Sequence, residues 1–213
     1  MGENGAGKST LLKLILRLYD VSSGQVMING IDIRQYDIQK LRQRMGVAFQ
    51  NSNIYALSYA ENLQLYGERT QADLESITGS LDLDKVLEKN QADFTTEITR
   101  EFSDSGMMLS GGEMQKMAIA RIMGGGFGLL LLDEPSSALD PLSEYKLTNL
   151  LLGEANQTTT IIVSHRLSTV READTILLMS DGKIKEKGSH DELMSMDGIY
   201  AEMFTKQSEL YGK

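Results

Sequence analysis

The fold is decided at the very start of the chain, by the eight residues GENGAGKS at positions 2–9. They fit the pattern G-x-x-x-x-G-K-[ST] without a gap, which is typical of a phosphate-binding loop that opens a helix. Glycines let the backbone curl so that several N–H groups point at one anion, and the helix adds its positive N-terminal end. The stretch therefore predicts a nucleotide phosphate site. The alternative is a glycine-rich turn before an ordinary helix.

Each residue type in this loop has an expected contact. Lys8 supplies a positive charge to the β- and γ-phosphates, and the Ser9 hydroxyl is placed to ligate Mg²⁺. The residues expected to bind the nucleotide here are Gly2, Asn4, Gly5, Ala6, Gly7, Lys8, Ser9 and Thr10.

Composition limits the classes of function. The 213 residues are enough for one domain, or for a core with a small satellite. A net charge of -9 leaves no basic surplus to meet nucleic-acid phosphates, so we expect no nucleic-acid partner. Cysteine is absent, which excludes disulfides and thiolate metal sites. No apolar run approaches the ~18 residues of a membrane span.

Hydrophobic periodicity and turn signals predict alternating strands and helices, hence an α/β domain with a largely parallel sheet. A hairpin is expected at Asp181-Gly182. Residues 58–108 are more polar and mostly helical, and form a candidate satellite. Strands are expected at residues 25–28, 45–50, 127–133, 159–164, 175–179 and 183–187, and further helices at residues 7–19, 110–123, 137–152, 191–195 and 199–208.

Two further motifs carry chemistry. LLLLDE at residues 129–134 places Asp133 and Glu134 at the end of a buried strand, the edge where open α/β sheets bind ligands. Asp133 is suited to hold Mg²⁺, and Glu134 is suited to accept a proton from the attacking water. The alternative is a strand that simply ends in solvated acids. LSGGE at residues 109–113 has the S-x-x-E spacing of a capping box, and its glycines leave helix N–H groups open to an anion.

Together these motifs resemble the ATP-binding cassette (ABC) ATPases along essentially the whole chain. The motifs that carry the resemblance are residues 2–9, Gln50, residues 109–113, 132–135, 137–140 and 164–166, in the family's order and spacing. The resemblance implies a P-loop NTPase-type, mostly parallel sheet flanked by helices, with a core of residues 1–51 and 109–213. Residues 52–108 would form the helical subdomain that leads into the signature. The antiparallel β portion that precedes the loop in the family lies outside this sequence.

The resemblance also implies roles for single residues. Two cassettes stack head to tail, so that Ser110, Gly111 and Gly112 meet a nucleotide held by the partner cassette. Glu134, His165 and Gln50 would be catalytic, and Asp140 would help to join the two sites. Mg²⁺ would be held by Ser9, Gln50 and Asp133. The sequence departs from the family's pattern at Glu113, where glutamine is usual.

Residues 164–170, 173–184, 188–193 and 198–204 resemble the exporter branch of the family. This implies an ATPase that powers transport, on the cytoplasmic face of a membrane, with a transmembrane domain fused upstream or separate. The partner cassette would be identical or different. We expect the chain to be the rear part of a longer transporter, truncated at the phosphate loop.

Two alternatives stay open. One is a cassette fragment that binds nucleotide weakly or not at all and lacks turnover. The other is a non-transport cassette ATPase. The single cassette, the acidic net charge and the lack of a heptad run make this alternative the less favoured one.

Overall fold

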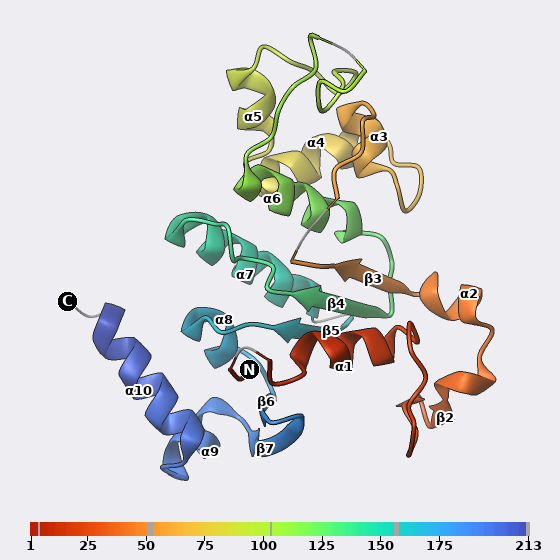
Figure 1. Ribbon diagram of the computed structural model, residues 1–213. Helices are drawn as coiled ribbons and strands as arrows, with labels where there is room; N and C mark the ends of the chain where they lie inside the picture. Colours follow the sequence, from red (N-terminus) through yellow and green to blue (C-terminus); the bar gives the residue numbers. More distant parts are fainter. Residues whose placement is uncertain (4, 51–52, 103, 156–157, 212–213) are drawn as a thin grey trace. The chain divides into compact units, whose positions relative to one another are not determined.

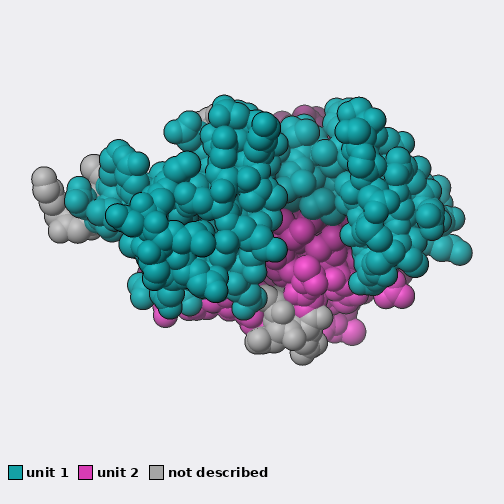
Figure 2. Space-filling model, turned by 90° about the horizontal axis from the view of Figure 1, so that it is seen from below, with its two compact units in different colours: residues 1–42, 162–213 teal, residues 43–161 magenta. Residues whose placement is uncertain are grey.

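The computed structural model describes all residues except 4, 51–52, 103, 156–157 and 212–213. The chain divides into two compact units, coloured separately in Figure 2. Unit 1 consists of Met1–Arg42 and Ile162–Lys213, and unit 2 consists of Gln43–Ile161. Each unit is described by itself below.

Unit 2 is built on a parallel sheet. Its strands are β3 (Met45–Ala48), β4 (Leu129–Asp133) and β5 (Thr159–Val163), in the order β3-β4-β5, and β5 contains the boundary between the units (Figure 1). β3 runs parallel to β4 with Met45 opposite Leu129. Leu130, Leu131 and Leu132 are buried, as a strand covered on both faces requires. The predicted α/β class, with a parallel sheet flanked by helices, is confirmed.

Three helices of unit 2, α3, α4 and α6, begin with a capping box. The side chains of Ser58, Thr70 and Ser110 each accept a backbone N–H from the residue three positions later. The carboxylate of that later residue accepts the N–H of the capping residue in return. α6 packs against α3 and β3, and Tyr59, Leu63 and Met117 are fully buried. The helices are α3 (Tyr59–Leu63), α4 (Gln71–Ser80), α5 (Asp84–Lys89), α6 (Gly111–Ile122) and α7 (Pro141–Ala155). The expected subdomain boundary at residues 52–108 stays a prediction.

Unit 1 joins the start of the chain to its end. The predicted hairpin at Asp181-Gly182 is confirmed: β6 (Ile176–Ser180) pairs antiparallel with β7 (Lys183–Gly188), and both turn residues have positive φ. A core cluster buries Met1 with Val170, Ile176, Leu178, Leu193 and Tyr200. The other elements are α1 (Lys8–Ile15), β1 (Met27–Ile28), β2 (Ile31–Asp32), η1 (Ile33–Gln35), α2 (Ile38–Arg42), α8 (Leu167–Arg171), α9 (His190–Ser195) and α10 (Ile199–Tyr211).

Two helix ends differ from the sequence prediction by four residues. α1 stops at Ile15 rather than residue 19, because Arg17 takes φ 52° and the Leu18 N–H bonds back to the Lys13 carbonyl at 2.9 Å. α7 starts at Pro141 rather than residue 137. Proline suits the first helical position, and Asp140 Oδ1 accepts the N–H groups of Leu142 and Ser143, both at 3.0 Å. Residues 137–140 are thereby left outside the helix.

Candidate active site

The phosphate loop in unit 1 begins where the chain lies against β6. The Met179 N–H donates to the Met1 carbonyl at 2.9 Å, and Gly2 forms a parallel bridge with Met179. Gly2 has φ 144°, and a Cβ built on it would lie 2.1 Å from the Met179 carbonyl oxygen. Only glycine therefore fits at this position.

The rest of the loop turns on two more glycines. Gly5 and Gly7 have φ 82° and 94°, in the left-handed region that glycine enters without steric cost. The Ala6 carbonyl between them accepts the Gly182 N–H at 3.2 Å, which fastens the loop to the β6–β7 turn. Asn4, the remaining predicted contact residue, lies outside the described residues.

Lys8 places its charge inside this loop. Its side chain is 8% exposed, and Nζ donates to the carbonyls of Gly2 at 2.7 Å and Glu3 at 2.8 Å. The α-amino group of Met1 lies close by, and burial together with the Lys8 charge lowers its pKa to about 6. The Lys8 ammonium is thus the cationic group that the loop offers to an anion.

Lys8 also begins α1, and the unpaired N–H groups of this first turn are available to an anion. The N-cap residue is Gly7, which has no side chain, so no side-chain hydrogen bond caps this N-terminus. Ser9 and Thr10 are exposed on the same turn, so their hydroxyls are open to ligands. The arrangement fits the phosphates of a nucleotide, with backbone N–H groups, one ammonium and two hydroxyls at one end of a helix.

The predicted acids lie in unit 2, at the end of β4. Asp133 is the last residue of the strand and is 7% exposed. Glu134 follows in a left-handed conformation, φ 51°, and its Oε2 accepts the Gln50 Nε2 amide at 3.4 Å. The structure thus brings together two of the predicted catalytic residues, Gln50 and Glu134, although they are 84 positions apart.

The LSGGE motif forms the start of α6 as predicted. The Ser110 Oγ accepts the Glu113 N–H at 3.3 Å, and the Glu113 carboxylate accepts the Ser110 N–H at 2.7 Å. Glu113 therefore caps the helix, as its spacing predicts. Gly111 is exposed, and Gly112 lies so close to the Ala138 carbonyl that a Cβ would stand 2.9 Å from its oxygen.

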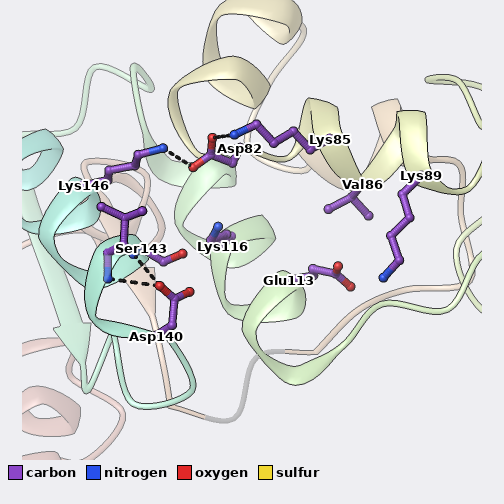
Figure 3. Close-up of a pocket in the computed structure, with 10 residues that line it drawn as sticks. Asp82, Lys85, Val86, Lys89, Glu113, Lys116, Asp140, Ser143 and Lys146 are labelled. Atoms are coloured by element: carbon purple, nitrogen blue, oxygen red, sulfur yellow. Dashed lines mark hydrogen bonds and ion pairs between the residues drawn. The ribbon is translucent and has the colours of Figure 1, made fainter.

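A basic depression of about 330 Å³ lies beside this helix (Figure 3). Lys85 and Lys146 reach Asp82 from α5 and α7, each at 2.6 Å, and their hydrogen bonds lower the pKa of Asp82 to about 2. Asp140 lines the same depression. Hydrogen bonds from Ser143 and Leu142 lower the pKa of the Asp140 carboxyl, so it is ionised at the start of α7. The other lining lysines are Lys89 and Lys116.

His165 lies between β5 and α8 and is exposed. It belongs to unit 1 together with the phosphate loop, whereas Gln50, Asp133, Glu134, the signature glycines and Asp140 belong to unit 2. That both sets serve one nucleotide stays a prediction.

Sequence reasoning missed two buried polar residues on α6. Gln115 is 4% exposed and Arg121 is 6% exposed. Arg121 donates to the Asn62 carbonyl at 3.0 Å, to Asn62 Oδ1 at 2.6 Å and to the Asn53 carbonyl at 2.6 Å. Sequence position could have identified Gln115. It lies on the apolar stripe of the helix with Ala118 and Ile119, where a buried polar side chain needs hydrogen-bond partners.

Asp133 is a carboxylate of the type that Mg²⁺ binds. Among the described residues there is no group of three or more His, Cys, Asp or Glu side chains that could hold a metal ion. Mg²⁺ is commonly bound by one or two carboxylates and by substrate phosphates, a role that buried Asp133 fits.

In the part of the chain that the structure describes, no helix is long and apolar enough to cross a membrane.

Comparison with known proteins gives consistent matches. The family described as "ABC transporter" matches residues 1–137. The chain is 37% identical to the mitochondrial iron-sulfur clusters transporter ATM1 of Saccharomyces cerevisiae, covering 99% of this chain and 30% of that protein. It is 34% identical to the ATP-dependent lipid A-core flippase of Coxiella burnetii, covering 97% of this chain and 35% of that protein.

Solved structures agree. A structure described as a bacterial Atm1-family ABC exporter with ATP bound matches with a TM-score of 0.85 at 35% identity, covering 97% of this chain and 36% of that one. The chain thus spans about a third of the length of the relatives it matches.

Proposed function

The chain belongs to the ABC transporter family, and from that membership we propose that it binds and hydrolyses ATP to drive an exporter. One observation carries the proposal: the buried Lys8 ammonium lies inside a glycine loop that opens α1. A buried ammonium whose partners among the described residues are neutral carbonyls is stabilised further by a phosphate, which supplies the opposite charge.

We propose that the triphosphate is held by the N–H groups of residues 5–10, by Lys8 and by the hydroxyls of Ser9 and Thr10. Mg²⁺ would be held by Ser9, Gln50 and Asp133, where it neutralises charge on the phosphates when bound. As the sequence predicts, these residues would serve the same nucleotide.

In hydrolysis, Glu134 accepts a proton from the attacking water. The carboxylate is suited to this task because the Gln50 amide lies 3.4 Å from its Oε2 and orients it. His165 would donate to the γ-phosphate. Phosphoryl transfer requires mainly positioning and charge stabilisation, so these groups do not need to form a covalent intermediate.

The assembly is also a proposal. A second cassette, identical or different, would meet the nucleotide with Ser110, Gly111 and Gly112, and Asp140 would lie near the joint. A transmembrane domain would hold the cassette at the cytoplasmic face. ATM1 is described as a transporter of iron-sulfur clusters and the Coxiella protein as a lipid A-core flippase; those cargoes are theirs, and no cargo is proposed for this chain.

The test is nucleotide affinity in a matched pair of lysine variants. Lys8→Ala removes the charge inside the loop, and Lys13→Ala removes the lysine from the last turn of the same helix. We expect Lys8→Ala to weaken binding of a fluorescent ATP analogue at least ~10-fold, because it removes a charge-assisted contact of about 1.5–3 kcal/mol. Lys13→Ala should bind like the parent. Equal affinity in both variants would exclude Lys8 as a phosphate ligand.

A further inference from the structure

The buried side chain of Gln115 connects α6 to the residues that follow β4. Its Nε2 donates to the Glu134 carbonyl at 2.8 Å and to Ser137 Oγ at 3.1 Å. Its Oε1 accepts the Ala138 N–H at 2.9 Å. Every polar atom of this side chain is therefore used on residues 134–138, which lie 19–23 positions further along the chain.

Glu134 needs such a support because its backbone is strained. A left-handed conformation in a residue other than glycine is strained, and it persists only where surrounding contacts determine it. Glu134 has φ 51°, and its carbonyl accepts two hydrogen bonds, from Gln115 and from the Ser137 N–H at 3.2 Å. The direction of the carboxylate is set by this backbone.

Gly112 strengthens the connection from the same face of the helix. Residues 112 and 115 are three apart, so both face the turn. A Cβ on Gly112 would lie 2.9 Å from the Ala138 carbonyl oxygen, closer than a real contact allows. The helix backbone therefore packs directly on this turn. One helical turn further along, the Gln115 amide contacts the same segment.

We propose that Gln115 is a positioning residue for Glu134, and that it transmits the position of the signature helix to the residue proposed as general base. The inference rests on the proposed role of Glu134. Gln115 lies five residues after Ser110, within the second turn of the same helix. A displacement of this turn by a ligand at Ser110 moves the Gln115 amide, and with it the backbone that aims the Glu134 carboxylate.

The test uses two substitutions in the protein of natural length with its partners. Gln115→Met keeps the volume and removes all three hydrogen bonds. Gln115→Glu keeps the size and the acceptor for the Ala138 N–H, but loses the two donations and sets an oxygen against the Glu134 carbonyl. We expect kcat for ATP hydrolysis to fall at least ~10-fold in both, because a ~1 Å misplacement of a reacting group costs up to about 10²-fold. KM for ATP should change less than about twofold, since binding is left in place.

A core truncation separates positioning from loss of stability. Leu74→Ala in α4 removes a side chain that is 3% exposed, in a helix that supplies none of the hydrogen bonds to residues 134–138 described above. It should lower the urea midpoint as much as Gln115→Met does, or more, while kcat of the folded protein stays at the parent value. If Gln115→Met loses activity only in proportion to its unfolded fraction, the inference is wrong.

A double-mutant cycle decides through which residue Gln115 acts. In a Glu134→Gln background, Gln115→Met should cause no further loss of the residual rate, because the group that it aims is already gone. A further loss of the same ~10-fold size would show that Gln115 acts elsewhere and would overturn the inference. Full activity of Glu134→Gln itself would instead refute the proposed base, whatever Gln115 does.

Discussion

Gly2 shows how tightly a single residue can be constrained at the start of the loop. The added methyl of Gly2→Ala would meet the Met179 carbonyl oxygen at 2.1 Å in a backbone with φ 144°. We expect the variant to lose about 2–4 kcal/mol in the free energy of unfolding, from backbone strain and overpacking together. Urea unfolding followed by circular dichroism measures this loss.

Gly30→Ala is the matched control in the same unit. Gly30 also has positive φ, 77°, but open space lies where its Cβ would go. Only the conformational cost applies, about 1 kcal/mol. Equal losses at Gly2 and Gly30 would contradict the close approach to Met179.

At this scale, the sequence predicted residues whose partners are near in the chain. Ser110 and Glu113 are three apart, and their reciprocal caps follow from local helix geometry. Gln115 is different: the spacing marks it as a polar residue on an apolar stripe, but its partners are set by how α6 packs on a turn 19 or more residues away. No local rule supplies that partner.

Between elements, Arg121 holds α6 to α3 and to the segment before it. Its guanidinium donates to three oxygens of Asn53 and Asn62. We expect Arg121→Met to destabilise the protein by about 2–4 kcal/mol, because it removes three hydrogen bonds from a charged donor, two of them to the fully buried Asn62. Arg121→Lys should recover only part of the loss, since an ammonium cannot reproduce the planar fork. Unfolding in urea checks both variants, and full recovery by lysine would contradict the geometry.

A second link joins α7 to the residues before α5 and depends on pH. The Asp82 pKa is about 2 in the folded chain, below its ordinary 3.8, because Lys146 and Lys85 stabilise the carboxylate. The stabilisation is therefore present above pH 3.8 and is lost as the pH falls through about 2. Asp82→Asn should reduce the free energy of unfolding at neutral pH by less than about 1 kcal/mol, because both lysines are partly exposed and screened.

Urea unfolding from neutral pH downward follows this difference between parent and variant. It should shrink as the pH approaches 2 and also in high salt. A difference that is constant with pH would show that the ion pairs do not cause it.

The boundaries of elements were less predictable than their existence. The sequence indicated the helix that became α7, but started it four residues early, at residue 137 instead of Pro141. Residues 134–139 fold instead into turns, with the Ser137 N–H on Glu134 and the Leu139 N–H on Ser136. Gln115 holds these turns through a contact between distant segments, and Pro141 with the Asp140 cap then begins α7.

For the whole molecule, alternating strands and helices predicted the parallel sheet, and motif order predicted the family. Neither rule places the phosphate loop of unit 1 relative to the acids of unit 2, because that depends on packing between segments far apart in sequence. The shared nucleotide and the partner cassette are therefore proposals that functional measurements must test.

Complementation tests the proposed pairing of two cassettes. In a head-to-tail dimer, Lys8→Ala damages one component of each site and Ser110→Glu damages the other. A mixed dimer then has one site with both defects and one intact site. We expect co-expressed variants to regain ATP hydrolysis that each lacks alone, measured as phosphate release. If the mixture stays as inactive as the separate variants, Lys8 and Ser110 do not serve a site shared between two cassettes.

The most direct test of the central claim is phosphate release by Glu134→Gln in the protein of natural length, measured together with ATP binding. Glutamine keeps the shape of the side chain but cannot accept the proton of the attacking water. We predict ATP affinity within a few-fold of the parent and a turnover rate lower by at least ~10²-fold, the usual contribution of a general base. Undiminished hydrolysis by Glu134→Gln would contradict the account.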